Sequence, residues 1–263
     1  MLIHDTLIMP NNNFKKIKKN FDPLLHGKES AEPFKISRSK IDLFLNCPRC
    51  FYLDRRLGIS QPSGPAFTLN VAVDTLLKKE FDIHRAKNTT HPLMEAYGID
   101  AVPFDHPDID KWRENFVGVQ YLHEPTNLLI FGAVDDIWQT PDGTLHVVDY
   151  KATSKAGEIE LEDTKWHNQY RRQMEVYQWL LRNNEFKVSD RGYFVYVNGR
   201  KDKEAFDGKL EFDVKIIPYD GDGSWIDKSI KDIHQCLMSD ELPKSGCDCE
   251  FCKYRVEAAK AEK

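Results

Sequence analysis

Two carboxylates and a lysine, Asp135, Asp149 and Lys151, are the residues whose types and spacing point most directly to chemistry. Asp135 ends a short run that begins at Gly132, and the other two lie two positions apart further along the chain. Carboxylate oxygens are the ligands that a hard cation such as Mg²⁺ takes in proteins. A nearby lysine orients a water or neutralises charge that builds up on a phosphate. Together these residues predict a divalent-metal site beside a phosphodiester.

A β-hairpin is predicted to position these side chains. Residues 126–139 and 145–151 are rich in β-branched, aromatic and other apolar residues, and the Pro-Asp-Gly sequence at 141–143 between them has turn chemistry. Because strand side chains alternate between faces, Asp149 and Lys151 are expected on one face and Val148 and Tyr150 on the other. A weak surface ion pair is the alternative interpretation of the two carboxylates and the lysine. Their combination with the helix described next favours the metal site.

That helix is predicted from about Asp163 to Arg182 by its apolar periodicity. Gln173 and Tyr177 are four residues apart and therefore share one helix face. The simplest interpretation is an amphipathic helix in which Tyr177 packs in the core and Gln173 is solvated. With the hairpin beside it, a functional role for the pair becomes the favoured interpretation.

Four of the six cysteines form two Cys-x-x-Cys pairs near opposite ends of the chain, Cys47 with Cys50 and Cys249 with Cys252. Two such pairs match a closed tetrahedral zinc site, and an iron-sulfur cluster uses the same kind of ligand. We favour zinc, with a four-iron four-sulfur cluster and ordinary buried thiols as the alternatives. Either metal would clamp the two ends of the domain together. Cys236 stands apart from these pairs and is expected to be a small core residue.

On these residues the chain resembles the PD-(D/E)xK nuclease superfamily, and in particular its RecB-type exonuclease branch, which includes the nucleases that accompany CRISPR spacer acquisition. The resemblance implies an α/β fold with a restriction-endonuclease-like core, in which a mixed central sheet is flanked by helices. It also implies one or two Mg²⁺ or Mn²⁺ ions on Asp135 and Asp149, assistance by Lys151, and DNA contact by Gln173 and Tyr177. The matching positions are Gly132, Asp135, Asp149, Tyr150, Lys151, Gln173 and Tyr177.

The chain departs from the branch in its third metal ligand and in its cysteines. Where the branch usually carries a metal-binding histidine, the aligned residue is Asp74, whose carboxylate is also suited to Mg²⁺ or Mn²⁺, and Glu80 competes for this role. The branch often holds its cluster with one upstream cysteine, matched here by Cys47, and three downstream ones. Here Cys50 is additional, and no cysteine follows Cys252.

Length and composition are those of one globular domain. The chain has 263 residues, with 41% hydrophobic and 30% charged residues, enough for a single elaborated α/β core. It contains no apolar stretch near the roughly 20 residues that span a bilayer and no apolar signal segment, so we expect a cytoplasmic protein without membrane contact. Because the net charge is -5, DNA contact must come from local basic clusters. Three candidate clusters are Arg38 with Lys40, Arg49 with Arg55 and Arg56, and Lys165 with Arg171 and Arg172. Solvated helix faces are the equal alternative interpretation of each.

The chain is expected to divide into a mobile basic N-terminal extension over 1–35, the nuclease domain over 36–255 and a C-terminal tail over 256–263. Within the domain, further helices are predicted over about 67–85 and 224–239, and further strands over 192–197 and 208–218.

The function expected from the residues and the resemblance is metal-dependent hydrolysis of DNA phosphodiester bonds. The substrate would be single-stranded DNA or duplex ends, and the role an exonuclease in DNA repair, recombination or CRISPR adaptation with a helicase or integrase as protein partner. A catalytically inactive nucleic-acid-binding or assembly module of the same fold is the alternative, and intact Asp135, Asp149 and Lys151 speak against it. A nuclease acting on RNA is a third interpretation, because both polymers share the phosphodiester.

Overall fold

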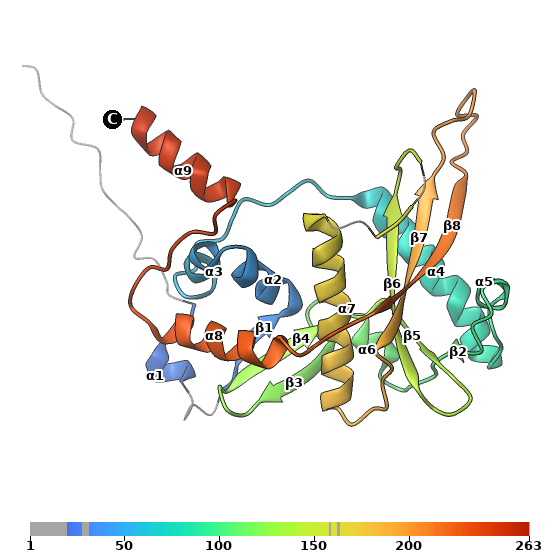
Figure 1. Cartoon of the computed structure of the whole chain (residues 1–263), viewed down its shortest axis with the longest axis horizontal. Coiled ribbons are helices and arrows are strands. Elements are labelled where there is room, and N and C mark those ends of the chain that lie inside the picture. The colour runs from blue at the N-terminus through green and yellow to red at the C-terminus, as the bar shows by residue number, and fades with distance from the viewer. Residues whose placement is uncertain (1–19, 28–31, 158, 162–163, 263) are drawn as a thin grey trace, which may run out of the picture.

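The computed structural model describes residues 20–27, 32–157, 159–161 and 164–262 (Figure 1). The helices are α1 (Pro23–His26), α2 (Arg38–Asn46), α3 (Pro48–Arg55), α4 (Thr68–Lys87), α5 (Pro92–Ala96), α6 (Ile109–Trp112), α7 (Lys165–Asn183), α8 (Ile226–Met238) and α9 (Glu250–Ala261). The strands are β1 (Phe34–Ser37), β2 (Val102–Pro103), β3 (Val119–His123), β4 (Leu128–Gly132), β5 (Asp136–Gln139), β6 (Leu145–Thr153), β7 (Arg191–Gly199) and β8 (Phe212–Asp220).

These strands form two mixed sheets. One has the order β1-β4-β3, with β1 parallel and β3 antiparallel to β4. The other has the order β2-β5-β6-β7-β8, in which β6 and β7 are parallel and the other neighbours are antiparallel. Helix α7 packs against β3, β4 and β6, and α4 packs against β6 and β2 (Figure 1). The predicted α/β class with mixed strands flanked by helices is confirmed, with two sheets in place of one.

The predicted strand over 126–139 is divided into two, and this is why there are two sheets. Strand β4 ends at Gly132 and β5 begins at Asp136, so residues 133–135 carry the chain from one sheet to the other. The Val134 N–H donates to the Trp112 carbonyl at 3.0 Å, and Arg113 Nε donates to the Asp135 carbonyl at 3.0 Å. Asp135 therefore lies at a junction that the last residue of α6 and the residue after it hold in place.

The hairpin between β5 and β6 forms as expected. Gly143 in its turn has a φ of +81°, a conformation that glycine adopts without strain. Along β6, Val148 and Tyr150 belong to a core cluster with Phe81 of α4, whereas Val147 belongs to the main core with Met174 of α7. Asp149 and Lys151 share the face that carries Val147, and this alternation confirms that they point away from Val148 and Tyr150.

Folded structure begins earlier than the sequence indicated. Residues 1–19 and 28–31 of the expected extension lie outside the described residues. Phe21 is nevertheless fully buried, its ring meets Phe34 edge-on at 5.0 Å between centroids, and Phe34 opens β1. The described parts of 1–35 thus belong to the folded domain, because an aromatic ring buried in the core anchors them.

The remaining predicted elements lie close to the observed ones. Helices α4 and α8 and strands β7 and β8 are all present within a few residues of their expected bounds. Helix α9 continues to Ala261 and projects from the body of the molecule, so most of the expected tail over 256–263 is helical (Figure 1).

Candidate functional site

The predicted catalytic residues gather around a cavity of about 450 Å³. Asp135 and Lys151 line it from the junction after β4 and from β6, and Gln173 lines it from α7. Asp149 is not part of the lining and has no exposed surface, but it contacts Lys151 and Gln173, which line the cavity. The remaining polar or aromatic groups of the wall include Arg38, Asp74, Lys78, Arg113 and Tyr170.

Asp149 and Lys151 form an ion pair on the α7 side of β6. Gln173 Nε2 donates to Asp149 Oδ1 at 2.7 Å, and Lys151 Nζ donates to Gln173 Oε1 at 3.4 Å. The Lys151 ammonium also lies 4.5 Å from the centre of the Tyr170 ring, a cation–π contact. One helix residue, Gln173, thus fixes both members of the pair in a defined orientation.

Burial sets the protonation of this pair. Complete burial raises the pKa of Asp149 to about 7, an effect that Lys151 opposes and that the Asp135 carboxylate reinforces. Burial lowers the pKa of Lys151, but Asp149 and Asp135 outweigh it and the net shift is upward. The pKa values of both groups are therefore shifted upward, and that of Asp149 lies close to neutral pH.

Asp135 points its side chain into the cavity from the junction between the sheets. Its Oδ2 accepts the Tyr150 N–H at 2.9 Å, and its Oδ1 lies 3.4 Å from Lys78 Nζ. The next residue, Asp136, points the other way and is fully buried between Arg85 and the Tyr150 hydroxyl. Of these two adjacent aspartates, Asp135 lines the cavity and Asp136 does not.

Asp74 lies on the cavity wall formed by α4, and its Oδ2 is 2.9 Å from Lys78 Nζ. Burial and the nearby Asp135 raise the pKa of Asp74. Burial lowers the pKa of Lys78, but Asp135 and Asp74 reverse this and raise it. The competing Glu80 pairs with His91 at 2.9 Å and is not part of the cavity wall. Asp74 is therefore the better placed of the two candidate ligands.

Gln173 and Tyr177 share the helix face that meets β6, as predicted. Gln173 Nε2 lies 3.1 Å from the Tyr177 hydroxyl, and both side chains are largely buried. They line a second hollow of about 180 Å³ that also contains Asp135. Gly132 is required here, because a Cβ at this position would lie 2.6 Å from Tyr177 Cε1.

Three basic residues at the site were not among the catalytic or DNA-binding residues predicted from the sequence motifs. Arg38 lines both hollows, and its Nη1 is buried without a hydrogen-bond partner among the described residues. Arg113 Nη1 donates to Asp82 Oδ1 at 2.9 Å, and Arg113 Nε donates to the backbone carbonyl of Asp135. Lys78 follows Asp74 at a helical spacing of four, which is a signal for a pair on one face. Arg38 stood in a predicted basic cluster, whereas no local pattern marked Arg113.

Several other members of the predicted basic clusters form ion pairs within the fold. Arg56 is 2% exposed and pairs with Asp240. Arg172 Nε donates to Asp42 at 2.6 Å, which joins α7 to α2. These cations stabilise packing between helices and are poorly placed to meet a nucleic acid.

The four paired cysteines converge. The Sγ atoms of Cys47, Cys50, Cys249 and Cys252 all lie within 4.8 Å of one another. The separations are 3.8 Å for Cys47 to Cys252, 3.5 Å for Cys50 to Cys249 and 3.6 Å for Cys50 to Cys252. This arrangement fits the predicted metal clamp, which joins the start of α3 to the start of α9.

Backbone groups favour the thiolate form of Cys47, whereas burial raises the pKa of Cys50 and that of Cys252. Burial raises the pKa of Cys47, but the N–H groups of Gly246 at 3.2 Å and Cys50 at 3.4 Å outweigh it and lower the pKa to about 7. Gly246 permits this approach, because a Cβ there would lie 2.1 Å from the Asn46 carbonyl oxygen. Cys236 packs against the main core, where burial raises its pKa to about 11.

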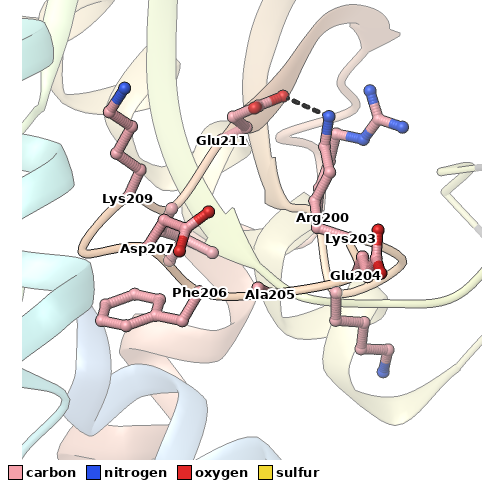
Figure 2. Close-up of a pocket in the computed structure, with 10 residues that line it drawn as sticks. Arg200, Lys203, Glu204, Ala205, Phe206, Asp207, Lys209 and Glu211 are labelled. Atoms are coloured by element: carbon pink, nitrogen blue, oxygen red, sulfur yellow. Dashed lines mark ion pairs between the residues drawn. The ribbon is translucent and has the colours of Figure 1, made fainter.

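A further hollow of about 590 Å³ lies in the loop between β7 and β8 (Figure 2). Its charged side chains are spread around the loop, and Lys203 pairs with Glu211 at 2.6 Å (Figure 2). Arg200 pairs with Asp202 of the same loop at 3.0 Å. Phe206 in this loop is 72% exposed. The loop lacks the convergence of carboxylates and lysine that marks the cavity at Asp135.

The chain belongs to the PD-(D/E)XK nuclease superfamily, whose family model it matches over residues 73–256. This range contains the carboxylates, the lysine and the α7 pair described above. Comparison with curated proteins gave no match. The described residues contain no helix long and apolar enough to cross a membrane.

Two solved structures resemble the chain at low identity. The crystal structure of SSO0001 aligns with a TM-score of 0.45 and 16% identity, covering 87% of each chain. The crystal structure named "Putative exonuclease" from Eubacterium rectale aligns with a TM-score of 0.42 and 13% identity, covering 86% of this chain and 90% of its own.

Proposed function

We propose that this protein is a divalent-metal-dependent nuclease that hydrolyses DNA phosphodiester bonds, and that it acts on DNA ends as an exonuclease of the RecB-type branch. The observation that carries the proposal is the group of Asp135, Asp149 and Lys151 at one cavity, with Gln173 holding the last two. Membership of the nuclease superfamily supports the same reaction class.

The donor set at the cavity fits Mg²⁺ or Mn²⁺. Asp135 and Asp149 offer hard carboxylate oxygens, and Asp149 Oδ2 pairs with the Lys151 ammonium. Asp74 provides a third carboxylate on the cavity wall. Since Mg²⁺ is commonly held by one or two carboxylates together with waters and substrate phosphates, this set is sufficient. Such an ion supplies a lowered pKa for bound water and stabilises charge on the phosphate.

The protein's own side chains have separable tasks in this proposal. Lys151 lines the cavity and carries a positive charge, which stabilises negative charge that develops on the cleaved phosphate. Gln173 keeps the Asp149 carboxylate in a fixed orientation through its 2.7 Å hydrogen bond. Arg38 lines the same cavity and is only partly buried, so its guanidinium is placed to meet a phosphate oxygen of the substrate.

The predicted DNA contact of Gln173 and Tyr177 remains part of the proposal. Their shared hollow of about 180 Å³ next to Asp135 would bring substrate close to both side chains. Their hydrogen bonds also give them a positioning task, because Gln173 connects Tyr177 to Asp149. A role in DNA repair, recombination or CRISPR adaptation, a helicase or integrase partner and a cytoplasmic location stay predictions.

For the cysteine clamp we propose one structural Zn²⁺. Four sulfurs bound tetrahedrally at about 2.3 Å from one ion lie about 3.8 Å apart. Three of the Sγ pairs here are 3.5 to 3.8 Å apart, and all four Sγ atoms lie within 4.8 Å of one another. The cysteines of a four-iron four-sulfur cluster bind different irons, which separates their sulfurs more widely. The close approach of the thiols therefore favours a single ion.

The proposed nuclease activity is tested with end-labelled single-stranded DNA, duplex DNA and RNA, incubated with Mg²⁺, with Mn²⁺ and without either ion. Metal-dependent shortening of labelled DNA, with product sizes that reveal the direction of digestion, is the expected result. Cleavage of RNA in place of DNA would overturn the substrate assignment. Binding of DNA without any cleavage would support the alternative of an inactive module.

A further inference from the structure

Lys78 occupies the space between two of the three candidate metal ligands. Its Nζ lies 2.9 Å from Asp74 Oδ2 and 3.4 Å from Asp135 Oδ1. Asp74 is on α4 and Asp135 is at the junction between the sheets, so this one ammonium bridges two separate parts of the fold. The contacts use the oxygens that a divalent cation at this site would need.

Each of the three carboxylates at the cavity contacts a lysine without a bound metal. Asp149 pairs with Lys151, and Asp74 and Asp135 share Lys78. Asp135 Oδ2 already accepts the Tyr150 N–H, which leaves Oδ1 as the oxygen nearest Lys78. A divalent cation bound to Oδ1 would lie within a few ångströms of the ammonium, and the two positive charges would repel each other.

The described residues contain no group of three carboxylates whose oxygens lie within 4.8 Å of one another. The three aspartates therefore contact lysines, but their oxygens are too far apart to bind one ion together. Closing them around an ion requires the ammonium of Lys78 to leave. The Lys78 side chain is 21% exposed and borders the cavity of about 450 Å³, so it has space into which to move.

We propose that Lys78 is an internal counter-ion, which holds the Asp74 and Asp135 carboxylates in the metal-free protein and exchanges for the divalent metal when the site is loaded. This inference rests on the proposed nuclease function, since that function requires the metal. It assigns to Lys78 a positioning role that weakens metal binding and stabilises the empty site.

The test is direct binding of Mn²⁺ to the full-length protein without DNA, measured by calorimetry and by the electron paramagnetic resonance signal of free Mn²⁺. Lys78→Met keeps the length and apolar stem of the side chain and removes its charge. We expect Lys78→Met to bind Mn²⁺ at least about fivefold more tightly than the wild type, because a nearby positive charge is gone. Lys79→Met is the matched control, since Lys79 is an exposed neighbour on the same helix.

Thermal unfolding gives a second readout. Without added metal, Lys78→Met should melt below the wild type, because Asp74 and Asp135 lose their shared counter-charge. Saturating Mn²⁺ should raise its melting temperature by more than that of the wild type or of Lys79→Met, because tighter binding adds more stability. If Lys78→Met does not fold, Lys78→Gln takes its place in both measurements.

Equal or weaker Mn²⁺ binding by the Lys78 variants would overturn the exchange, as would an absence of binding in every protein. Failure of the nuclease proposal gives a different pattern. Tighter Mn²⁺ binding by Lys78→Met together with no DNA cleavage by the wild type would support the counter-ion role and reject the nuclease. Cleavage by the wild type with unchanged Mn²⁺ affinity in the variants would support the nuclease and reject the counter-ion role.

Discussion

Asp149 and Lys151 are buried together, and this changes the effect of a substitution at either position. Removing Lys151 would leave the Asp149 carboxylate without its counter-charge in a site with no exposure. Breaking such a pair on one side typically costs about 3–5 kcal/mol. Lys151→Ala would thus lose stability as well as catalysis, and variants that keep the shape of the side chain separate the two effects.

Asp149→Asn is the cleaner variant for the reaction. We expect it to lower the nuclease rate by at least about 100-fold, because it removes a charged group from a preorganised site. The fold should persist, since the asparagine oxygen still accepts the Gln173 hydrogen bond. Rates on labelled DNA and circular dichroism measure the two effects. Asp142→Asn makes the same change in the exposed turn after β5 and should retain the rate; near-normal activity of Asp149→Asn would exclude Asp149 from the site.

The stability of the metal-free protein should depend on pH through Asp149. Burial raises its pKa from 3.8 to about 7, so the folded state holds a proton that the unfolded chain releases. The stability from this proton is fully present below the unfolded pKa and is lost as the pH rises through the folded one. The unfolding free energy of the wild type, relative to Asp149→Asn, should therefore fall by roughly 1–3 kcal/mol between about pH 5 and pH 8. Urea unfolding of both proteins without added Mg²⁺ or Mn²⁺ measures this, and a constant difference would contradict it.

Arg38 is expected to bind the substrate backbone. Arg38→Met should weaken binding to single-stranded DNA about fivefold. It should also lower the steepness of the plot of log binding constant against log salt concentration by about 1, because one phosphate contact is lost. Fluorescence anisotropy over a salt series, without divalent metal, measures both. Arg191→Met is the control, since Arg191 is exposed and pairs with Asp220. An equal affinity in Arg38→Met and the wild type would place the phosphate elsewhere.

At the scale of elements, the site depends on how closely α7 approaches the end of β4. Gly132 has no Cβ, and this absence lets the Tyr177 ring lie against the strand. The junction at 133–135 then turns away, which points Asp135 into the cavity and Asp136 into the core behind it. In a strand continuous from 126 to 139, Asp135 and Asp136 would simply alternate between the two faces of one sheet, because successive strand side chains point in opposite directions.

Gly132→Ala should push Tyr177 away from Gln173, because the new methyl would lie 2.6 Å from Tyr177 Cε1. We expect a loss of about 1–3 kcal/mol in unfolding free energy, as for overpacked cores, together with a lower nuclease rate. Urea unfolding and the DNA assay measure these. At Gly64 a methyl group would have no neighbour within 4 Å among the described residues, so Gly64→Ala is the control and should change neither quantity. Wild-type behaviour of Gly132→Ala would mean that this close contact is not required.

At the scale of the whole molecule, the cysteine cluster joins residues that are 205 positions apart, Cys47 and Cys252. A metal at this place stabilises the folded state over the unfolded one, because the four thiols are brought together by folding. The cluster lies at α3 and α9, whereas the cavity lies between α4, β6 and α7. Its loss should therefore affect the fold in general and the chemistry only through the fold.

Cys252→Ser should lower the melting temperature and reduce the bound zinc from about one ion per chain towards none. Elemental analysis of anaerobically purified protein and thermal unfolding measure these. Cys247→Ser changes a nearby exposed cysteine outside the cluster and should leave both unchanged. Iron with sulfide and a brown solution would identify a cluster in place of zinc. Absence of any metal from the wild type would leave the four thiols as ordinary core groups.

The sequence by itself determined the relations within each element. Asp149 and Lys151 share a strand face because they are two residues apart, and Gln173 and Tyr177 share a helix face because they are four apart. The two Cys-x-x-Cys pairs likewise indicated one ligand set, which the structure brings together. These relations follow from backbone periodicity and from ligand chemistry, and both can be deduced from the spacing of residues along the sequence.

The tertiary structure alone decided the relations between elements. Lys78 reaches Asp135 across 57 positions, Phe21 enters the core from a segment predicted to be an extension, and the strand after Thr126 divides between two sheets. The upward pKa shift of Asp149 also depends on burial that no spacing reveals. These features arise from packing among distant side chains, where the competition between burial, charge pairing and close contact is resolved only in three dimensions.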